Sequence, residues 1–88
     1  MDSKAILVTA IRQIKGEDSA APGPGVDLVY DLCLDSIEFA ELFFKLEHEL
    51  NVELEYSDLK RLCRNKRKNK ELKIFFEDVL EYIASIKP

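Results

Sequence analysis

The segment LDSIEFAELFFKLEHEL, Leu34 to Leu50, decides the fold because it predicts one long amphipathic helix in the middle of the chain. Each residue turns a helix by about 100°, so a set of its apolar side chains falls within a sector of roughly 100°. These side chains are Phe39, Leu42, Phe43, Leu46 and Leu50. We interpret this sector as the face that packs on the core. Asp35 as N-cap with Glu38 at the third helical position predicts a variant of the capping box, and Asn51 is a suitable end.

A second apolar stripe runs along the same helix. Ile37, Ala40 and Phe44 recur at i, i+3 and i+7, roughly 140° from the centre of the core face. Glu41 and Glu47 flank them. An apolar surface stripe with acidic edges suits the docking of a basic partner better than it suits folding. The alternative is that Phe44 is covered by the preceding loop or by a basic segment described below.

Residues 3–15 predict a first helix, because apolar side chains recur with the spacing i, i+3, i+4 and i+7. These side chains are Leu7, Ala10, Ile11 and Ile14. Ser3 is a suitable N-cap and Gly16 a suitable stop. Residues 16–34 predict a long loop, since its first part contains all three glycines of the chain and two of the three prolines. Its second part has three leucines that we expect to anchor it on the core, namely Leu28, Leu32 and Leu34.

Two helices are expected in the C-terminal part of the chain. The stretch YSDLKRLCR, residues 56–64, predicts a short helix capped by Ser57 or Asp58. Its inward residues would be Leu59, Leu62 and Cys63. The stretch NKRKNK, residues 65–70, is interpreted as exposed and mobile. A last helix is expected over residues 71–86, with a wide apolar face made by Phe75, Phe76, Val79, Leu80, Ile83 and Ile86.

The expected fold is therefore all-α, a small antiparallel four-helix bundle with a long first loop and a short third helix. The chain has 88 residues, 47% of them hydrophobic and 34% charged, which fits one soluble domain over residues 1–88. No apolar run approaches the roughly 18 residues of a membrane span, and the apolar patch 5–8 is too short for a signal peptide. We expect a cytoplasmic protein without stable membrane insertion, and a monomer.

Neither a metal site nor an enzyme active site is predicted. Cys33, Cys63 and His48 are too few and too far apart in sequence for a structural zinc site. Ser36 lies in the first turn of the central helix, where its simplest role is to help cap that helix. His48, the only histidine, lies about three turns further along and cannot reach the Ser36 hydroxyl as a base. No Gly-x-Ser-x-Gly elbow is present, and no residue is assigned a catalytic role.

The charges are distributed unevenly along the chain. Residues 60–73, the basic segment, contain eight of the 13 Lys and Arg residues and one acid, Glu71, so the formal charge of the segment is +7. The net charge of the whole chain is −4, so the rest of the chain is strongly acidic. Three interpretations stay open: a solvated loop without a specific role, a patch that selects an acidic partner, or contact with an anionic membrane surface or nucleic acid. Nucleic acid is the least favoured and we expect no such partner, because the segment lacks interleaved aromatic residues.

The stretch DLVYDLCLDSIEFAELFFKLEHELNVEL, residues 27–54, resembles the acyl carrier protein family. That family has a leucine-rich loop end, an Asp-Ser-Leu motif and an acidic helix with regular apolar positions. Asp35-Ser36-Ile37 stands for the motif in this chain, and FFEDVLEYI, residues 75–83, looks like the last helix of the family. The resemblance covers about residues 3–59 and 74–86 of the chain.

The resemblance implies a discrete acyl carrier protein, a phosphoprotein of fatty acid biosynthesis or other lipid metabolism that performs no reaction alone. In this family a phosphopantetheinyl transferase moves 4′-phosphopantetheine from coenzyme A onto the motif serine, here Ser36. The thiol of that arm holds acyl groups as thioesters. A phosphodiester at a helix N-terminus would be favoured by free N–H groups and the helix dipole. Asp35 would cap the helix and help engage the transferase and its magnesium.

The resemblance also implies a partner surface and a place for the acyl chain. Acyl-loading and acyl-processing enzymes would read the second stripe of the central helix. Its apolar centre would be Ile37, Ala40 and Phe44, and its charges would be Glu38, Glu41 and Glu47. The acyl chain would lie between the helices, although the same positions also fit an ordinary core. The candidate lining residues are Phe39, Leu46, Leu62 and Phe75.

The chain departs from the family pattern at three places. Cys33 stands where a glycine commonly precedes the motif, and Ile37 replaces the usual leucine. The basic segment replaces a shorter and more acidic connection, which favours a carrier dedicated to one lipid or secondary-metabolite pathway. The alternative is a carrier-like helical adaptor that binds partner proteins through the central helix and is never modified.

Overall fold

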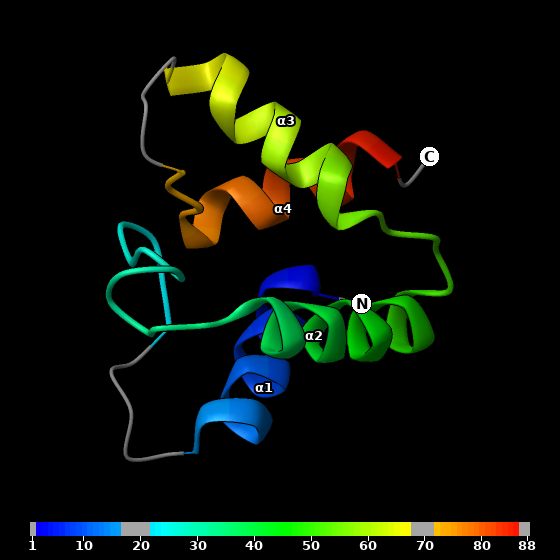
Figure 1. Cartoon of the computed structure of the whole chain (residues 1–88). Coiled ribbons are helices and arrows are strands. Elements are labelled where there is room, and N and C mark those ends of the chain that lie inside the picture. The colour runs from blue at the N-terminus through cyan, green and yellow to red at the C-terminus, as the bar shows by residue number, and fades with distance from the viewer. Residues whose placement is uncertain (1, 17–21, 68–71, 87–88) are drawn as a thin grey trace.

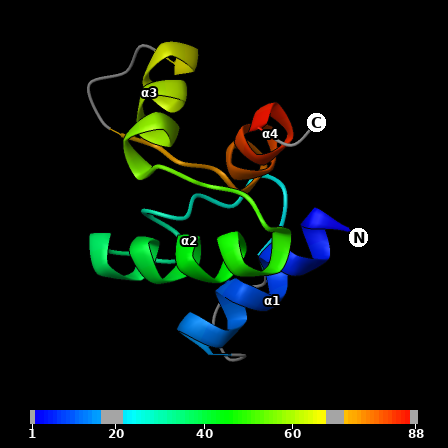
Figure 2. The ribbon, with the colours of Figure 1, turned by 90° about the vertical axis from the view of Figure 1, so that its right-hand side faces the viewer.

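The computed structural model describes residues 2–16, 22–67 and 72–86, and these residues form four helices and no extended strand. The helices are α1 (Ser3–Lys15), α2 (Ser36–Leu50), α3 (Tyr56–Arg67) and α4 (Phe76–Ile86). In Figures 1 and 2, α1 and α2 lie side by side as one pair, and α3 and α4 form a second pair packed on it. This arrangement confirms the predicted all-α four-helix bundle. None of these helices, within the described ranges, is long and apolar enough to cross a membrane.

The boundaries of α2 follow its local sequence. The Asp35 carboxylate accepts the Glu38 backbone N–H at 2.8 Å, and the Glu38 carboxylate accepts the Asp35 N–H at 3.1 Å, so the predicted capping box is confirmed. Asn51 ends the helix with a left-handed φ of 54°, as expected for a C-terminal asparagine. The predicted core face is confirmed as well. Its buried residues are Phe39, Leu42, Phe43, Leu46 and Leu50.

The first helix has the predicted length but a different cap. The Asp2 carboxylate accepts the Lys4 backbone N–H at 3.1 Å, so Asp2 is the N-cap and Ser3 is already helical. The prediction of Ser3 as the cap was wrong by one residue, because Asp and Ser are both favoured at the N-cap and stand next to each other here. Gly16 ends the helix at a φ of 88°, as predicted. Of the predicted inward residues, Ile14 is half-buried and the others are buried, namely Leu7, Ala10 and Ile11.

The long loop before α2 is held in place by backbone hydrogen bonds. Its three leucines, Leu28, Leu32 and Leu34, are buried as predicted. The Leu28 N–H donates to the Ile74 carbonyl at 2.8 Å, and the Phe76 N–H donates to the Val26 carbonyl at 2.9 Å. These bonds form an isolated antiparallel bridge between the loop and the chain just before α4. They tie the loop that leads into α2 to the beginning of α4.

The same bridge sets the start of α4. Residues 72–75 are not helical, so the prediction of a helix from Glu71 was wrong, and Glu71 itself lies outside the described residues. Phe75 pairs in the bridge instead, which requires an extended backbone. Of the predicted apolar face, Phe75 and Leu80 are half-buried and Ile86 is exposed. The buried residues of α4 are Phe76, Asp78, Val79, Tyr82 and Ile83.

The third helix starts earlier and ends later than expected. It begins at Tyr56, so Ser57 and Asp58 lie inside the first turn, and the prediction of either as the cap was wrong. Leu59 and Cys63 are buried and Leu62 is half-buried, close to expectation. The helix continues through residues 65–67, which were expected to be an exposed mobile stretch. Tertiary contacts of α3 with α4, described below, stabilise this polar last turn.

Candidate functional site

Ser36 is the first residue of α2 and is exposed to solvent. The cap of this helix is the neighbouring Asp35, whose carboxylate accepts the Glu38 N–H. The predicted N-cap, Asp35, is therefore confirmed, and Ser36 does not occupy the cap position. Within the described residues, no hydrogen bond of the Ser36 hydroxyl is found. The hydroxyl is thus accessible and is not required to hold the helix terminus.

The α2 N-terminus combines features that attract an anion with features that repel one. The first-turn N–H groups have no partner inside the helix, and the positive end of the helix dipole lies there. The carboxylates of Asp35 and Glu38 lie at the same end and oppose an anion. Lys15, the last residue of α1, compensates part of this charge, because its Nζ lies 3.2 Å from Glu38 Oε2. The terminus therefore presents both attractive and repulsive groups to an anion, and Lys15 supplies the positive side chain beside Glu38.

Lys15 is a site residue that the sequence analysis missed. It lies 23 positions from Glu38, and no local pattern links two charges so far apart in the chain. Its position at the end of α1 follows the general preference for basic residues in a last helical turn. Both side chains of the pair are half-buried, so solvent screens this contact less than it screens an exposed pair.

Cys33, three residues before Ser36, has a backbone φ of +55°. This is the left-handed region, which a residue with a Cβ adopts at a cost and glycine adopts freely. The family resemblance expects a glycine at this position, and the conformation explains that preference. The cysteine leaves the turn intact, since the Leu34 N–H still donates to the Leu28 carbonyl at 3.0 Å. The turn directs Leu34 into the core and leaves Ser36 in solvent.

The second apolar stripe of α2 is on the surface. Ile37 is 75% exposed, Phe44 is 73% exposed, and Ala40 between them is also exposed. Among the residues that the structure describes, neither the loop nor the basic segment covers Phe44. Two large apolar side chains at such exposure on one helix face form a surface that costs free energy unless a partner covers it.

The acidic residues around this stripe differ in their exposure and in the contacts that they already make. Glu41 is exposed, whereas Glu38 and Glu47 are half-buried. Glu38 takes part in the capping box and the Lys15 pair. Glu47 accepts the Leu54 backbone N–H at 3.1 Å and so holds the connection from α2 to α3. Of these carboxylates, Glu41 is the one placed to meet a partner directly.

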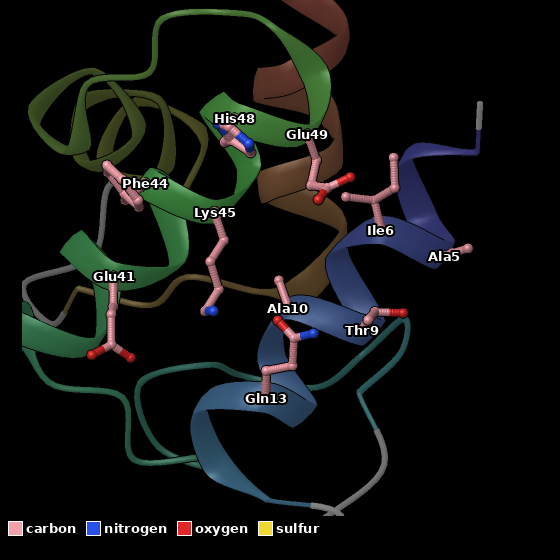
Figure 3. A pocket seen from close by; sticks show the side chains of 10 residues that line it. All are labelled: Ala5, Ile6, Thr9, Ala10, Gln13, Glu41, Phe44, Lys45, His48 and Glu49. Atoms are coloured by element: carbon pink, nitrogen blue, oxygen red, sulfur yellow. The ribbon is translucent and has the colours of Figure 1, made fainter.

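A groove runs along the surface between α1 and α2, beside Phe44 (Figure 3). Its volume is about 780 Å³. Uncharged α1 side chains line one wall, and mostly polar or charged α2 side chains, together with Phe44, line the other. The lining residues are Ala5, Ile6, Thr9, Ala10, Gln13, Glu41, Phe44, Lys45, His48 and Glu49. The groove thus continues the exposed α2 stripe toward α1, although the sequence analysis did not predict it.

The positions expected to line an acyl chain are occupied by packed side chains. Phe39 and Leu46 are fully buried in the core, and Leu62 and Phe75 are half-buried. The Phe39 ring stacks on the Tyr56 ring with 4.9 Å between centroids. Burial raises the pKa of Tyr56 above its usual 10.0, so its phenol is neutral at neutral pH. Phe39 and Leu46 thus belong to the core and Leu62 packs against it, as the alternative of an ordinary core expects for these three positions.

Part of the basic segment is bonded to its own domain. Lys66 Nζ lies 3.1 Å from Oδ1 of the buried Asp78 and also pairs with Glu81. The hydrogen bonds to Glu81 and to Asp78 raise the pKa of Lys66 above its usual 10.5. The interpretation as a solvated loop without a role is therefore wrong for Lys66. Residues 68–71 of the segment lie outside the described residues.

Comparisons with protein-family models, with curated protein sequences and with solved structures find no match for this chain. The α2 N-terminus and the exposed face of α2 are the features of this chain that point to a function.

Proposed function

We propose that this protein is a discrete acyl carrier. Ser36 receives 4′-phosphopantetheine from coenzyme A, and the chain shuttles acyl intermediates between enzymes of a specialised lipid or secondary-metabolite pathway. The observation that carries this proposal is the position of Ser36, exposed at the start of α2 while Asp35 alone caps the helix. A serine that the fold does not need, at the end of a helix that favours an anion, suits covalent attachment of a phosphate.

The residues present fit such a group, with the chemistry divided between the chain and a transferase. The Ser36 hydroxyl forms the new bond to phosphorus, and the adenosine bisphosphate part of coenzyme A leaves. The base must come from the transferase, because His48 lies about 18 Å along the α2 axis from Ser36. Magnesium held with the transferase would offset the Asp35 carboxylate. When bound, the arm supplies a thiol that carries acyl groups as thioesters.

The exposed stripe of α2 supports a role in which several enzymes bind the same carrier. Ile37, Ala40 and Phe44 supply apolar area that becomes buried on docking, which provides affinity. Glu41 supplies a free carboxylate that orients a basic partner. Because the stripe begins next to Ser36, an enzyme bound to it lies beside the attachment point.

A second candidate function is an unmodified helical adaptor that binds partners through α2 in the cytoplasm. The specific observation that favours it is the pair of carboxylates, Asp35 and Glu38, at the helix end where an anion would be attached. In this case the apolar stripe alone would carry the function, and Ser36 would have no chemical role.

One experiment separates the two candidates. The protein is incubated with coenzyme A, magnesium and a broad-specificity phosphopantetheinyl transferase, and its intact mass is measured. Ser36→Ala runs beside it, with Ser57→Ala as the matched control, since Ser57 is also exposed in the first turn of a helix. We expect one added phosphopantetheine in the parent and in Ser57→Ala, and none in Ser36→Ala. No addition to the parent, with the transferase active on a known carrier, would establish the adaptor instead.

A further inference from the structure

Aromatic rings pack between α2 and α3, beginning one turn after Ser36. Phe39 is 1% exposed, and its ring lies nearly parallel to the Tyr56 ring, with 4.9 Å between centroids and 17° between planes. Phe43, on the next turn of α2, meets Tyr56 edge to face at 5.9 Å. Its other side approaches Tyr82 of α4 at 6.4 Å. The rings thus form one continuous layer from α2 to α3 and α4.

This aromatic layer, made of Phe39, Phe43, Tyr56 and Tyr82, is held by contacts beyond the rings. The Lys60 ammonium lies 4.8 Å from the centroid of the Tyr56 ring, which is a cation–π contact. The Tyr82 hydroxyl accepts the Glu55 backbone N–H at 2.8 Å. Glu55 lies directly before α3, so this bond fastens Tyr82 to the start of α3. Opening the layer between α2 and α3 requires the loss of the ring contacts that Phe39 and Phe43 make with Tyr56.

We propose that the cargo of this carrier is a short or polar acyl group that stays in solvent and does not enter the bundle. The inference rests on the proposed function, because it concerns the group carried through Ser36. A long apolar chain gains free energy with each methylene that leaves water, so a carrier of such chains needs interior space. Here aromatic rings occupy the contact between α2 and α3, and Phe39, one turn after Ser36, stacks on Tyr56. A short or polar acyl group has little to gain from burial and needs no such space.

The test attaches chains chemically, so that it does not depend on a transferase. The full-length protein carries Ser36→Cys to supply the thiol and Cys33→Gly to remove the exposed native thiol. Cys63 is 2% exposed and is protected by burial. Ethyl, hexyl and dodecyl iodoacetamides each alkylate the new thiol with loss of iodide. Amide chemical shifts and the melting temperature are then compared across the three chain lengths.

We expect shift changes that stay near position 36 for every chain, with no rise in melting temperature as the chain lengthens. Shift changes at Leu46 or Leu59 that grow with chain length, together with a higher melting temperature, would overturn the inference. Shift changes at Thr9 and Ala10 would overturn it too, because a long chain would then be sheltered in the groove between α1 and α2.

Two variants test whether the aromatic rings are what keeps a long chain out of the bundle. In Tyr56→Ala the layer loses its central ring. We expect the dodecyl chain then to change the amide chemical shift of Leu46 and to raise the melting temperature. Tyr56→Phe keeps the ring and should behave like the parent. If the dodecyl chain also stays outside in Tyr56→Ala, the aromatic layer is not what excludes it. Phe43→Leu, a milder opening of the same layer, gives the same comparison if Tyr56→Ala does not fold. A failure of transferase loading would remove the proposed function without changing these readouts.

Discussion

The ammonium group of Lys66 lies 3.1 Å from Oδ1 of Asp78, a side chain with no exposed surface. The same carboxylate accepts the Phe75 backbone N–H at 2.9 Å, and the Cys63 Sγ lies 3.7 Å from it. A buried carboxylate is costly unless its oxygens are paired. Lys66 therefore fastens the last turn of α3 to the first turn of α4, and one residue of the basic segment is part of the fold.

Replacement of Lys66 by glutamine should lower the free energy of unfolding, because Asp78 would lose its charged partner while staying buried. Equilibrium unfolding in urea measures the change. The matched control is Arg61→Gln, which breaks an exposed pair with Asp58 at 3.6 Å on the same helix. That pair should be worth at most about 1 kcal/mol. Equal losses in the two variants would show that the Lys66 pair contributes no more than a surface contact.

The stability of the protein should fall at alkaline pH. Hydrogen bonds to Glu81 and Asp78 raise the pKa of Lys66 above 10.5, and burial raises the pKa of Tyr56 and of Tyr82 above 10.0. Each group favours its protonated form more strongly in the folded state. Its contribution is therefore complete below the unfolded pKa and is lost as the pH rises through the folded value.

The check on this pH dependence is urea unfolding at a series of pH values above and below pH 10, the ordinary tyrosine value. We expect a flat stability on the neutral side and a decline on the alkaline side. Tyr56→Phe removes one of the three groups, so its decline should be shallower than that of the parent. A stability that is unchanged well above the ordinary tyrosine value would contradict the expected coupling.

Asp35→Ala and Ser36→Ala should differ clearly in stability. The loss of the Asp35 cap should cost about 1 kcal/mol, because the Glu38 N–H loses its acceptor. Ser36→Ala should change stability by no more than about 0.5 kcal/mol, since this exposed hydroxyl does not cap the helix. Thermal unfolding followed by circular dichroism measures both. A larger loss of stability in Ser36→Ala than in Asp35→Ala would show that Ser36 has a structural role.

Phe43 and Phe44 are neighbours in sequence with opposite environments. Phe43 is 4% exposed and lies in the aromatic layer, so Phe43→Ala should cost about 3–5 kcal/mol. Phe44 is 73% exposed, so Phe44→Ala should change stability by about 0.5 kcal/mol or less. Phe44→Ala should nonetheless weaken binding to a partner enzyme, for which the transferase serves as the probe in a titration. A large loss of stability in Phe44→Ala would place this side chain in the core.

Substitutions at Cys33 should report its left-handed backbone. Cys33→Gly removes the strain of a Cβ at a φ of +55°, which offsets the greater freedom of glycine in the unfolded chain. Its stability should therefore equal or exceed that of the parent. Cys33→Val should lose about 1 kcal/mol or more, because a β-branched residue tolerates this region poorly. Urea unfolding of both variants measures this difference. Equal stability of Cys33→Val and Cys33→Gly would contradict a strained backbone at position 33.

Local features of the sequence were sufficient for α2 and for much of the candidate site. The capping box, the left-handed end at Asn51 and the buried face all depend on residues within a few positions of one another. The same periodicity placed Ile37 and Phe44 on the exposed face. Where two caps were locally equivalent, as with Asp2 and Ser3, the sequence could not choose between them.

The remaining features were decided by tertiary structure, because they join residues far apart in the chain. The bridge between Asp27 and Phe75 delays the start of α4, and the Lys66 pair with Asp78 stabilises a turn of α3 that has no apolar residue. Such contacts depend on which faces meet, and helical periodicity carries no information about that. The sequence alone thus determined a capped amphipathic helix with an exposed serine and a second apolar stripe. Only the packing of α2 against α3 and α4 decided that the rings of Phe39 and Phe43 meet those of Tyr56 and Tyr82.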